Sequence, residues 1–244
     1  MKTQCRPQRI EFQIENRRDL VAQFNGGDIC SDSGALLLRQ TEQITEIIKQ
    51  FADCFTDYRD PDLIEHTVEQ LVAQRVYALA LGYEDLNDHD ELRSDPLLAA
   101  LIGKQDPTGQ DRRNPHDKGK ALAGKSTLNR LELTPVRASA DSRYKKITLD
   151  RHKVDAFFVK AFLQSYVTPP ERIVLDLDAT DDPLYGEQSG RFFHGYYKSY
   201  CYLPLYIFCG HHLLCARLRP ADIDGAAGSV KELKRYGLYV CSSR

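Results

Sequence analysis

The stretch Glu171–Asp182, with the sequence ERIVLDLDATDD, reads as an apolar strand that ends in a cluster of carboxylates. Side chains in a strand alternate between its two faces, so acidic and aliphatic side chains separate here. One face takes Ile173, Leu175 and Leu177, and the other takes Val174, Asp176 and Asp178. Carboxylates that lie close together repel each other unless a positive charge lies between them.

Two interpretations of these carboxylates are open. In the first, Asp176 and Asp178 bind a divalent metal ion, because carboxylate oxygens are the ligands that Mg²⁺ prefers and such ions act on phosphate esters. In the second, Asp176 forms a salt bridge, Asp178 starts a turn, and Asp181 and Asp182 cap the element that follows. The motif by itself favours neither interpretation.

Composition limits the class of protein. The 244 residues carry a formal net charge of −2, which excludes a nucleic-acid binder that is basic throughout but not one with a local basic patch. The seven cysteines are an odd number without a spacing framework, as is typical of reduced thiols. No apolar run reaches the roughly 20 residues that cross a bilayer, and the first residues do not form a signal peptide. We therefore expect a cytoplasmic protein that has no membrane partner.

Residues 1–150 are expected to form a mainly helical, locally basic region that binds DNA. A short strand is predicted at Ile10–Ile14 and a helix from Ser31. A second helix is predicted where Asp60-Pro61 precedes an apolar stripe at helical spacing. A third is expected through Leu97–Leu101. The first hundred residues therefore read as almost entirely helical.

Positive charge accumulates between Lys104 and Lys146, and a polar stretch rich in Pro and Gly lies at residues 104–120. Such a patch is suited to pairing with DNA phosphates. The candidate DNA-binding side chains are Arg112, Arg113, Lys125, Arg130, Lys145 and Lys146. A solvated loop is the alternative interpretation of the same charges.

Residues 119–126, GKALAGKS, match the phosphate-binding pattern G-x-x-x-x-G-K-[ST] of P-loop proteins. A P-loop follows a buried parallel strand, whereas residues 110–117 are polar and contain Pro115. We therefore interpret the match as fortuitous. A P-loop nucleotide hydrolase that uses Gly119–Ser126, with Lys125 on the phosphates, remains an alternative. The helix expected from Ser126 also resembles the DNA-contacting helix of a helix-turn-helix.

Residues 151–244 predict an order of strand, strand, strand and helix. A helix at Lys153–Tyr166 precedes the acidic strand. Strands are predicted at Tyr197–Phe208 and Leu213–Leu218, and a helix at Ala226–Arg235 follows them. The predicted fold class is therefore α+β, with a helical N-terminal region followed by a β-β-β-α core.

Four residues near the second of these strands are acceptable zinc ligands, namely Cys209, His211, His212 and Cys215. Their spacing differs from that of a zinc finger. A histidine pair at a turn, beside cysteines that pack as small apolar residues, is the preferred interpretation.

Four strings are more specific than any of these short motifs. They are ALGYEDLNDHDEL at Ala80–Leu92, VLDLDATDDPLYG at Val174–Gly186, FHGYYKSYCYLPL at Phe193–Leu205 and LCARLRP at Leu214–Pro220. Through them the chain resembles the DDE transposases of bacterial insertion sequences, whose catalytic domain has an RNase H-like, integrase-type fold. The resemblance extends over about residues 20–235.

The resemblance implies cleavage and transfer of DNA strands at element ends by a two-metal mechanism with Mg²⁺. It implies that Asp178, with Asp176 as the fallback, is the first catalytic aspartate and a metal ligand. Residues 151–244 would be the N-terminal part of an RNase H-like catalytic domain. The implied partner is DNA that carries the terminal repeats of the insertion sequence, and a homodimer is compatible with this family.

The sequence departs from the family pattern after the helix at Ala226–Arg235. Neither the second aspartate nor the glutamate follows, and Asp222 and Asp224 precede that helix, so they do not match the second position. We therefore expect a C-terminally truncated transposase with an incomplete core, unable by itself to transfer strands. A non-catalytic DNA-binding protein or inhibitor derived from a transposase is the alternative.

Overall fold

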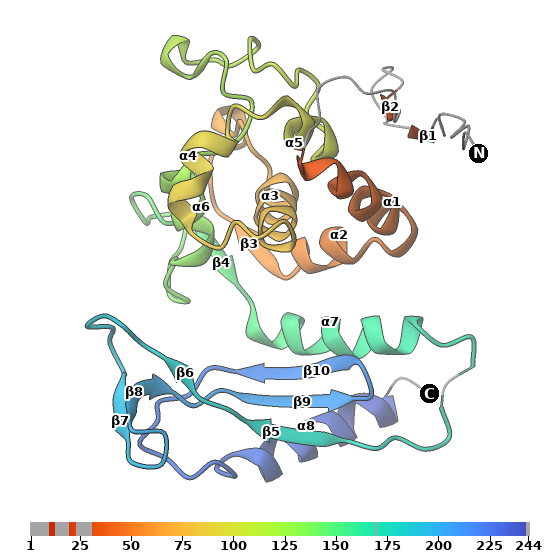
Figure 1. Cartoon of the computed structure of the whole chain (residues 1–244), viewed down its shortest axis with the longest axis vertical. Coiled ribbons are helices and arrows are strands. Elements are labelled where there is room, and N and C mark those ends of the chain that lie inside the picture. The colour runs from red at the N-terminus through yellow and green to blue at the C-terminus, as the bar shows by residue number, and fades with distance from the viewer. Residues whose placement is uncertain (1–9, 13–19, 23–30, 169, 243–244) are drawn as a thin grey trace, which may run out of the picture. The chain divides into compact units, whose positions relative to one another are not determined.

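The computed structural model of the chain describes residues 10–12, 20–22, 31–168 and 170–242 (Figure 1). The chain divides into two compact units, Met1–Asp150 and Arg151–Arg244, called unit 1 and unit 2 below. Helices occur together with small antiparallel sheets, which confirms the predicted α+β class. Within the described ranges no helix combines the length and the apolar character needed to span a bilayer.

Unit 1 is built mainly from helices around one apolar core. Its α-helices are α1 (Ala35–Thr45), α2 (Ile47–Ala52), α3 (Val68–Ala80), α4 (His89–Leu92), α5 (Pro96–Leu101) and α6 (Lys125–Glu132). Its 3₁₀ turns are η1 (Ser31–Gly34), η2 (Pro61–Leu63), η3 (Leu86–Asp88) and η4 (Pro115–Asp117). Its strands are β1 (Ile10–Phe12), β2 (Leu20–Ala22), β3 (Phe55–Asp57) and β4 (Ile147–Leu149).

Helix α3 supplies the centre of the unit 1 core, where Leu71 and Tyr77 are almost fully buried. The helix begins after Thr67, whose side chain accepts the Gln70 N–H while the Gln70 side chain accepts the Thr67 N–H. This capping box satisfies two backbone donors at the helix start. A strong cap and an apolar face therefore act together on this segment.

Two predicted helix boundaries are wrong. Asp60 caps only η2, because the chain becomes extended at Ile64 before α3 begins. The helix expected from Ser31 is divided at Glu46, whose φ of 50° lies in the left-handed region, so α1 and α2 are separate. Local signals marked where helical turns form but not how far each one continues.

Two short strand pairs complete unit 1. β3 pairs antiparallel with β4, and Ile147 of β4 is buried in the core. This pair was not predicted, because three-residue strands are too short to show a period of two. The predicted strand at Ile10–Ile14 appears as β1, which pairs with β2, while residues 13 and 14 lie outside the described ranges.

Unit 2 combines helices with two small antiparallel sheets, ordered β10-β9-β5 and β6-β8-β7. Its elements are α7 (Arg151–Gln164), β5 (Asp176–Ala179), β6 (Asp182–Pro183), β7 (Phe192–His194), β8 (Ser199–Tyr202), β9 (Leu205–Cys209), β10 (His212–Arg217) and α8 (Ser229–Ser242). Elements β5, β9, β10 and α8 follow the predicted order of strand, strand, strand and helix. Figure 1 shows these three strands side by side, with α7 along β10.

Helices α7 and α8 cover one face of the β10-β9-β5 sheet. Val159 and Phe162 of α7 meet Ile207 and Cys215 of the sheet in one core, which Tyr236 of α8 joins. Ile207 and Cys215 lie opposite each other in the β9–β10 ladder, so both point to the same face. The opposite face of this sheet is exposed to solvent along β5, where it carries Asp176 and Asp178.

A cluster of four charged side chains links both helices to β10. Asp155 of α7 contacts Arg217 of β10 and Arg235 of α8, and Glu232 of α8 contacts both arginines. The side chain of Asp155 is only 3% exposed. Two carboxylates and two guanidinium groups balance in charge, which matters because an unpaired buried charge is strongly destabilising.

The strand predicted at Tyr197–Phe208 is wrong in one respect, because the structure divides it into β8 and β9 at Leu203-Pro204. Pro204 has no N–H to donate to a ladder, and the Leu203 N–H donates to the Arg219 carbonyl at 2.9 Å. The break separates the two sheets of unit 2. The β6-β8-β7 sheet was not predicted, because its strands have only two to four residues.

Candidate functional site

Strand β5 places the two predicted metal ligands on one face of the sheet. Asp176 and Asp178 are two residues apart in the strand and therefore point the same way. Leu177, between them, lies opposite the buried Ile207 and points to the face that the helices cover. The predicted separation of acidic and apolar side chains is confirmed.

The two carboxylates lie on an exposed surface beside two aromatic rings. In the β5–β9 ladder Asp176 is opposite Phe208 and Asp178 is opposite Tyr206, and the centroids of these two rings are 6.3 Å apart. Both aspartates are exposed, and neither carboxylate forms a hydrogen bond or an ion pair with another described residue. The interpretation in which Asp176 forms a salt bridge and Asp178 starts a turn is therefore wrong, since both lie within β5.

Tyr197 lies near this acidic surface, although no sequence pattern marked it. Burial raises the pKa of the Tyr197 phenol, and the negative charges of Asp181 and Asp178 raise it further. Its ring contacts His194 and Tyr196, with centroids 4.9 Å and 5.0 Å away. Its only signal in the sequence was its place in the string Phe193–Leu205.

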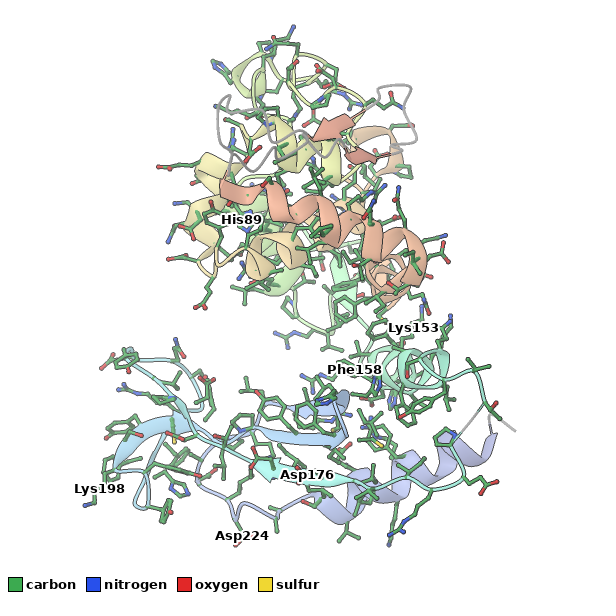
Figure 2. The ribbon with its side chains drawn as sticks, turned by 45° about the vertical axis from the view of Figure 1, so that its right-hand side comes forward. His89, Lys153, Phe158, Asp176, Lys198 and Asp224 are labelled. Atoms are coloured by element: carbon green, nitrogen blue, oxygen red, sulfur yellow. The ribbon has the colours of Figure 1, made fainter. Side chains whose placement is uncertain are left out.

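Asp224 does not join the carboxylate pair. Its carboxylate accepts the Ala226 N–H at 2.8 Å and so caps the loop before α8, where Figure 2 labels it. The neighbouring Gly225 approaches the other face of β5, since a Cβ added to it would lie 3.6 Å from the Cβ of Ala179. Ala179 and Asp178 point to opposite faces of the strand. The loop therefore packs away from the surface that carries Asp178.

The donor chemistry of Asp176 and Asp178 fits Mg²⁺. This ion takes oxygen ligands and commonly binds through one or two carboxylates while it keeps several water molecules. Two exposed, unpaired carboxylates on one strand face meet that requirement for one ion. Among the residues that the structure describes, no group of three or more His, Cys, Asp or Glu side chains is arranged to hold a metal ion.

Two of the residues considered as zinc ligands, His212 and Cys215, have packing roles. The ring of His212 lies 5.5 Å from Phe162 and 5.9 Å from Tyr166, measured between centroids, and its Nε2 lies 3.3 Å from the Ser165 hydroxyl. Cys215 is buried in the core of unit 2. These contacts account for both residues in terms of helix-to-sheet packing.

Three of the predicted DNA-binding side chains make contacts within unit 1. Arg112 pairs with Glu65 at 2.8 Å and donates to the Lys120 and Leu122 carbonyls, so it holds the 104–120 loop together. Arg113 donates to the Asp62 carbonyl, and Lys125 binds Asn87 and Asp90. The Arg112 side chain, 11% exposed, has little surface left for a phosphate.

Of the other three, Arg130 lies beside an exposed aromatic ring, and Lys145 and Lys146 follow that ring in the sequence. Tyr144 is 58% exposed, and the guanidinium groups of Arg143 and Arg130 lie 4.8 Å and 6.0 Å from its ring centroid. Lys145 and Lys146 follow directly, and Lys145 donates to the Leu133 carbonyl. We call Arg130, Arg143, Tyr144, Lys145 and Lys146 the basic surface of unit 1. Arg143 was part of the basic stretch in the sequence but not among the candidates.

The segment that matches a P-loop is built differently. Residues 121–123 are buried in the core, and α6 begins directly after them at Lys125. The carboxylate of Asp90 accepts the Lys125 N–H and pairs with the Lys125 ammonium, so a negative charge already lies where a P-loop would bind phosphate. The segment before α6 is η4 and extended chain, which differs from the two helices of a helix-turn-helix.

Comparison with known proteins gives one match. The family model described as transposase DDE domain group 1 matches residues 12–240. No curated protein and no solved structure shows significant similarity. The matched range includes the strand with Asp176 and Asp178, the loop with Tyr197 and the basic surface of unit 1. Since the match extends over more than half of the sequence, the chain belongs to the transposase DDE domain family.

Proposed function

We propose that this chain acts in DNA transposition, in the Mg²⁺-dependent cleavage and transfer of DNA strands at the ends of an insertion sequence. The observation that carries the proposal is the pair of exposed, unpaired carboxylates on β5, in a chain whose family acts with divalent metal ions. Asp178 is proposed as the first metal ligand and Asp176 as the second group that holds the same ion.

In this proposal, residues of the chain position the metal ion and supply the negative charge that holds it. A bound Mg²⁺ would stabilise negative charge on a phosphate of the DNA backbone and activate the attacking oxygen. Asp176 and Asp178 would hold the ion on the open face of the sheet, where β5 lies at the edge of the β10-β9-β5 order and a strand of DNA has access. Tyr206 lies opposite Asp178 in the ladder, on the same face of the sheet.

The basic surface of unit 1 is proposed as the part that holds DNA. Its cations lie around an exposed ring, and each contact with a phosphate releases bound counterions. Arg112 and Arg113 are proposed to act indirectly, by keeping the loop at residues 104–120 in place. Lys125, paired with Asp90, is proposed to contribute less than Arg130 or Arg143.

The proposal includes the expectation that this chain alone does not transfer strands. Two metal ions need more ligands than one pair of carboxylates supplies. Binding of DNA ends without strand transfer is what an inhibitor derived from a transposase would also show. The two roles differ in metal dependence, because an inhibitor that only covers DNA ends needs no ion on Asp178.

A mobility-shift titration of the full chain tests the DNA-binding half of the proposal. The probe is a duplex that carries the terminal repeats flanking the gene, and the reference is an unrelated duplex. We expect preferential binding of the repeats that weakens as salt rises, with the salt slope reduced by about 1 in Arg143→Gln. Lys160→Gln, which removes an exposed cation from α7, is the matched control and should keep the slope. Equal, weak binding of both duplexes would contradict the proposal.

A further inference from the structure

The β6-β8-β7 sheet presents aromatic rings to solvent on one face. Phe193 of β7 lies opposite Tyr200 of β8 in the ladder, and their ring centroids are 5.5 Å apart. Phe193 is 56% exposed and Tyr200 is 49% exposed. We call the antiparallel pair β7 and β8 with its turn the aromatic ribbon. The two rings meet edge to face, with 70° between their planes, and together form an exposed apolar surface.

A cation extends this surface. The guanidinium of Arg191 lies over the Tyr200 ring, 4.8 Å from its centroid. The Gly186 carbonyl accepts a hydrogen bond from Arg191 at 2.6 Å, which fixes the guanidinium in this position. Arg191, Tyr200 and Phe193 are therefore contiguous planar groups, with Arg191 over the Tyr200 ring and Phe193 edge to face with it. Planar aromatic and guanidinium groups stack well on nucleobases, because every base has a π face.

The aromatic ribbon is close to the proposed metal ligands within unit 2. Only Thr180 and Asp181 separate β5 from β6, and Asp182 of β6 lies opposite Tyr202 of β8. The turn of the ribbon, residues 195–198, joins β7 to β8 and carries Tyr197. The turn also carries Lys198, exposed at the tip of the ribbon in Figure 2. A DNA strand held on Asp178 therefore has an aromatic surface with positive charge within reach.

We propose that Phe193, Tyr200 and Arg191 bind unpaired nucleotides of a DNA strand end by base stacking. Bases within a duplex have both faces covered by their neighbours, so flat rings gain contact only with bases that have left the stack. The guanidinium of Arg191 lies 3.7 Å from the Glu187 carboxylate, so Lys198 supplies the positive charge that favours a phosphate-bearing strand over an apolar peptide. This inference rests on the proposed function and specifies its substrate as a DNA end with separated strands.

Fluorescence of 2-aminopurine tests the inference directly. The full chain is titrated with a duplex that has a short unpaired 3′ tail containing 2-aminopurine, and with the same duplex blunt-ended. We expect tighter binding of the tailed duplex and quenching of the 2-aminopurine signal by stacking. Phe193→Ala and Tyr200→Ala should each weaken binding of the tailed duplex by about 5- to 150-fold and leave binding of the blunt duplex unchanged.

Two further variants keep the test decisive. Tyr200→Phe keeps the ring and should keep the preference, which excludes loss of fold as the cause. Tyr185→Ala removes a fully exposed ring outside this group of three and should change nothing.

Equal binding of both duplexes by the unaltered chain would overturn the stacking inference while leaving the proposed function intact. No binding of either duplex would contradict the proposed function itself. A change from dimer to monomer in Phe193→Ala without DNA would assign the surface to a second copy of the chain and also overturn the inference.

Discussion

Gln74 forms two hydrogen bonds with the backbone of Ala123. Its side-chain nitrogen donates to the Ala123 carbonyl at 2.7 Å, and its side-chain oxygen accepts the Ala123 N–H at 3.0 Å. Both residues are buried, and the Gln74 nitrogen also lies 3.0 Å from Nδ1 of His89. The Gln74 side chain of α3 thus satisfies the backbone N–H and carbonyl of Ala123, as a neighbouring strand would do for this buried segment at residues 121–123. Residues matched to a P-loop are in this way fixed as part of the core.

We expect Gln74→Leu to destabilise unit 1 by about 2–6 kcal/mol. The substitution leaves a buried N–H and a buried carbonyl of Ala123 without partners, and each such group costs about 1–3 kcal/mol. Urea unfolding followed by circular dichroism measures the loss. Glu69→Gln, on the exposed side of the same helix, should stay within about 0.5 kcal/mol of the unaltered chain. A similar effect of both substitutions would contradict the role of Gln74.

The stability of unit 1 should fall as the pH is lowered from about 6.5 towards 4. Burial lowers the pKa of His89 to about 4 and that of His66 to about 2, and nearby cations add to the effect at both. The unfolded chain therefore binds more protons than the folded chain in this window, so stability is present above the unfolded pKa and decreases below it.

The slope of this decrease identifies His89. Each histidine that protonates only on unfolding contributes about 1.4 kcal/mol per pH unit to the slope. We expect His89→Gln to lower the slope by about one such contribution between pH 6 and pH 5, about one to two units above the folded pKa of His89 of about 4. Urea unfolding at closely spaced pH values measures it. An unchanged slope in His89→Gln would show that the histidine is protonated in the folded state.

Substitution of Asp155 should be among the most destabilising changes in unit 2. Asp155→Ala leaves the guanidinium groups of Arg217 and Arg235 with only Glu232 between them, inside the contact of α7, α8 and β10. We expect a loss of about 3–5 kcal/mol, as is typical when one partner of a buried ion cluster is removed. Thermal unfolding monitors the effect. Asp222→Asn removes an exposed carboxylate from the same unit and serves as the control, with little expected change.

A pair of glycine substitutions tests how the loop at residues 104–120 is held. Gly109 has a φ of +68°, and a Cβ added to it would lie 2.5 Å from the backbone nitrogen of Ala121. Gly34 has an ordinary φ of −58°, and an added Cβ would have nothing within 4 Å. We expect Gly109→Ala to cost about 2–5 kcal/mol through strain and overlap, and Gly34→Ala to be close to neutral. Comparable unfolding midpoints for both variants would contradict the close approach at Gly109.

The acidic strand was predictable because the alternation of apolar and acidic residues that marks it lies within a few consecutive residues. Alternation of apolar and acidic residues placed Asp176 and Asp178 on one face, and the structure confirms that placement through the β5–β9 register. The helical character of α3 and α7 was predictable for a similar reason, since each carries an apolar pattern over more than three turns. The order of strand, strand, strand and helix in unit 2 followed from these elements.

Features that depend on tertiary contact were not predictable. The two- to four-residue strands of the β6-β8-β7 sheet show no period, and they form because partners from other elements complete their hydrogen bonds. Burial and the negative charges of Asp181 and Asp178 raise the pKa of Tyr197, and neither effect is visible as a pattern in the sequence. Arg112 was expected on a DNA-facing loop because its charge is visible in the sequence, whereas its contacts with Glu65 and two carbonyls are not.

Binding of Mn²⁺, a paramagnetic substitute for Mg²⁺, tests the central claim most directly. The loss of the free-ion signal in electron paramagnetic resonance reports binding by the full chain, with and without DNA that carries the terminal repeats. We expect Asp178→Asn to weaken Mn²⁺ binding by at least about tenfold, since even changes around a metal ligand reach that size, and Asp176→Asn to weaken it as well. Glu171→Gln, an exposed acid before the same strand, should bind as the unaltered chain does. Equal Mn²⁺ affinity in Asp178→Asn and the unaltered chain would contradict the assignment of Asp178 as a metal ligand.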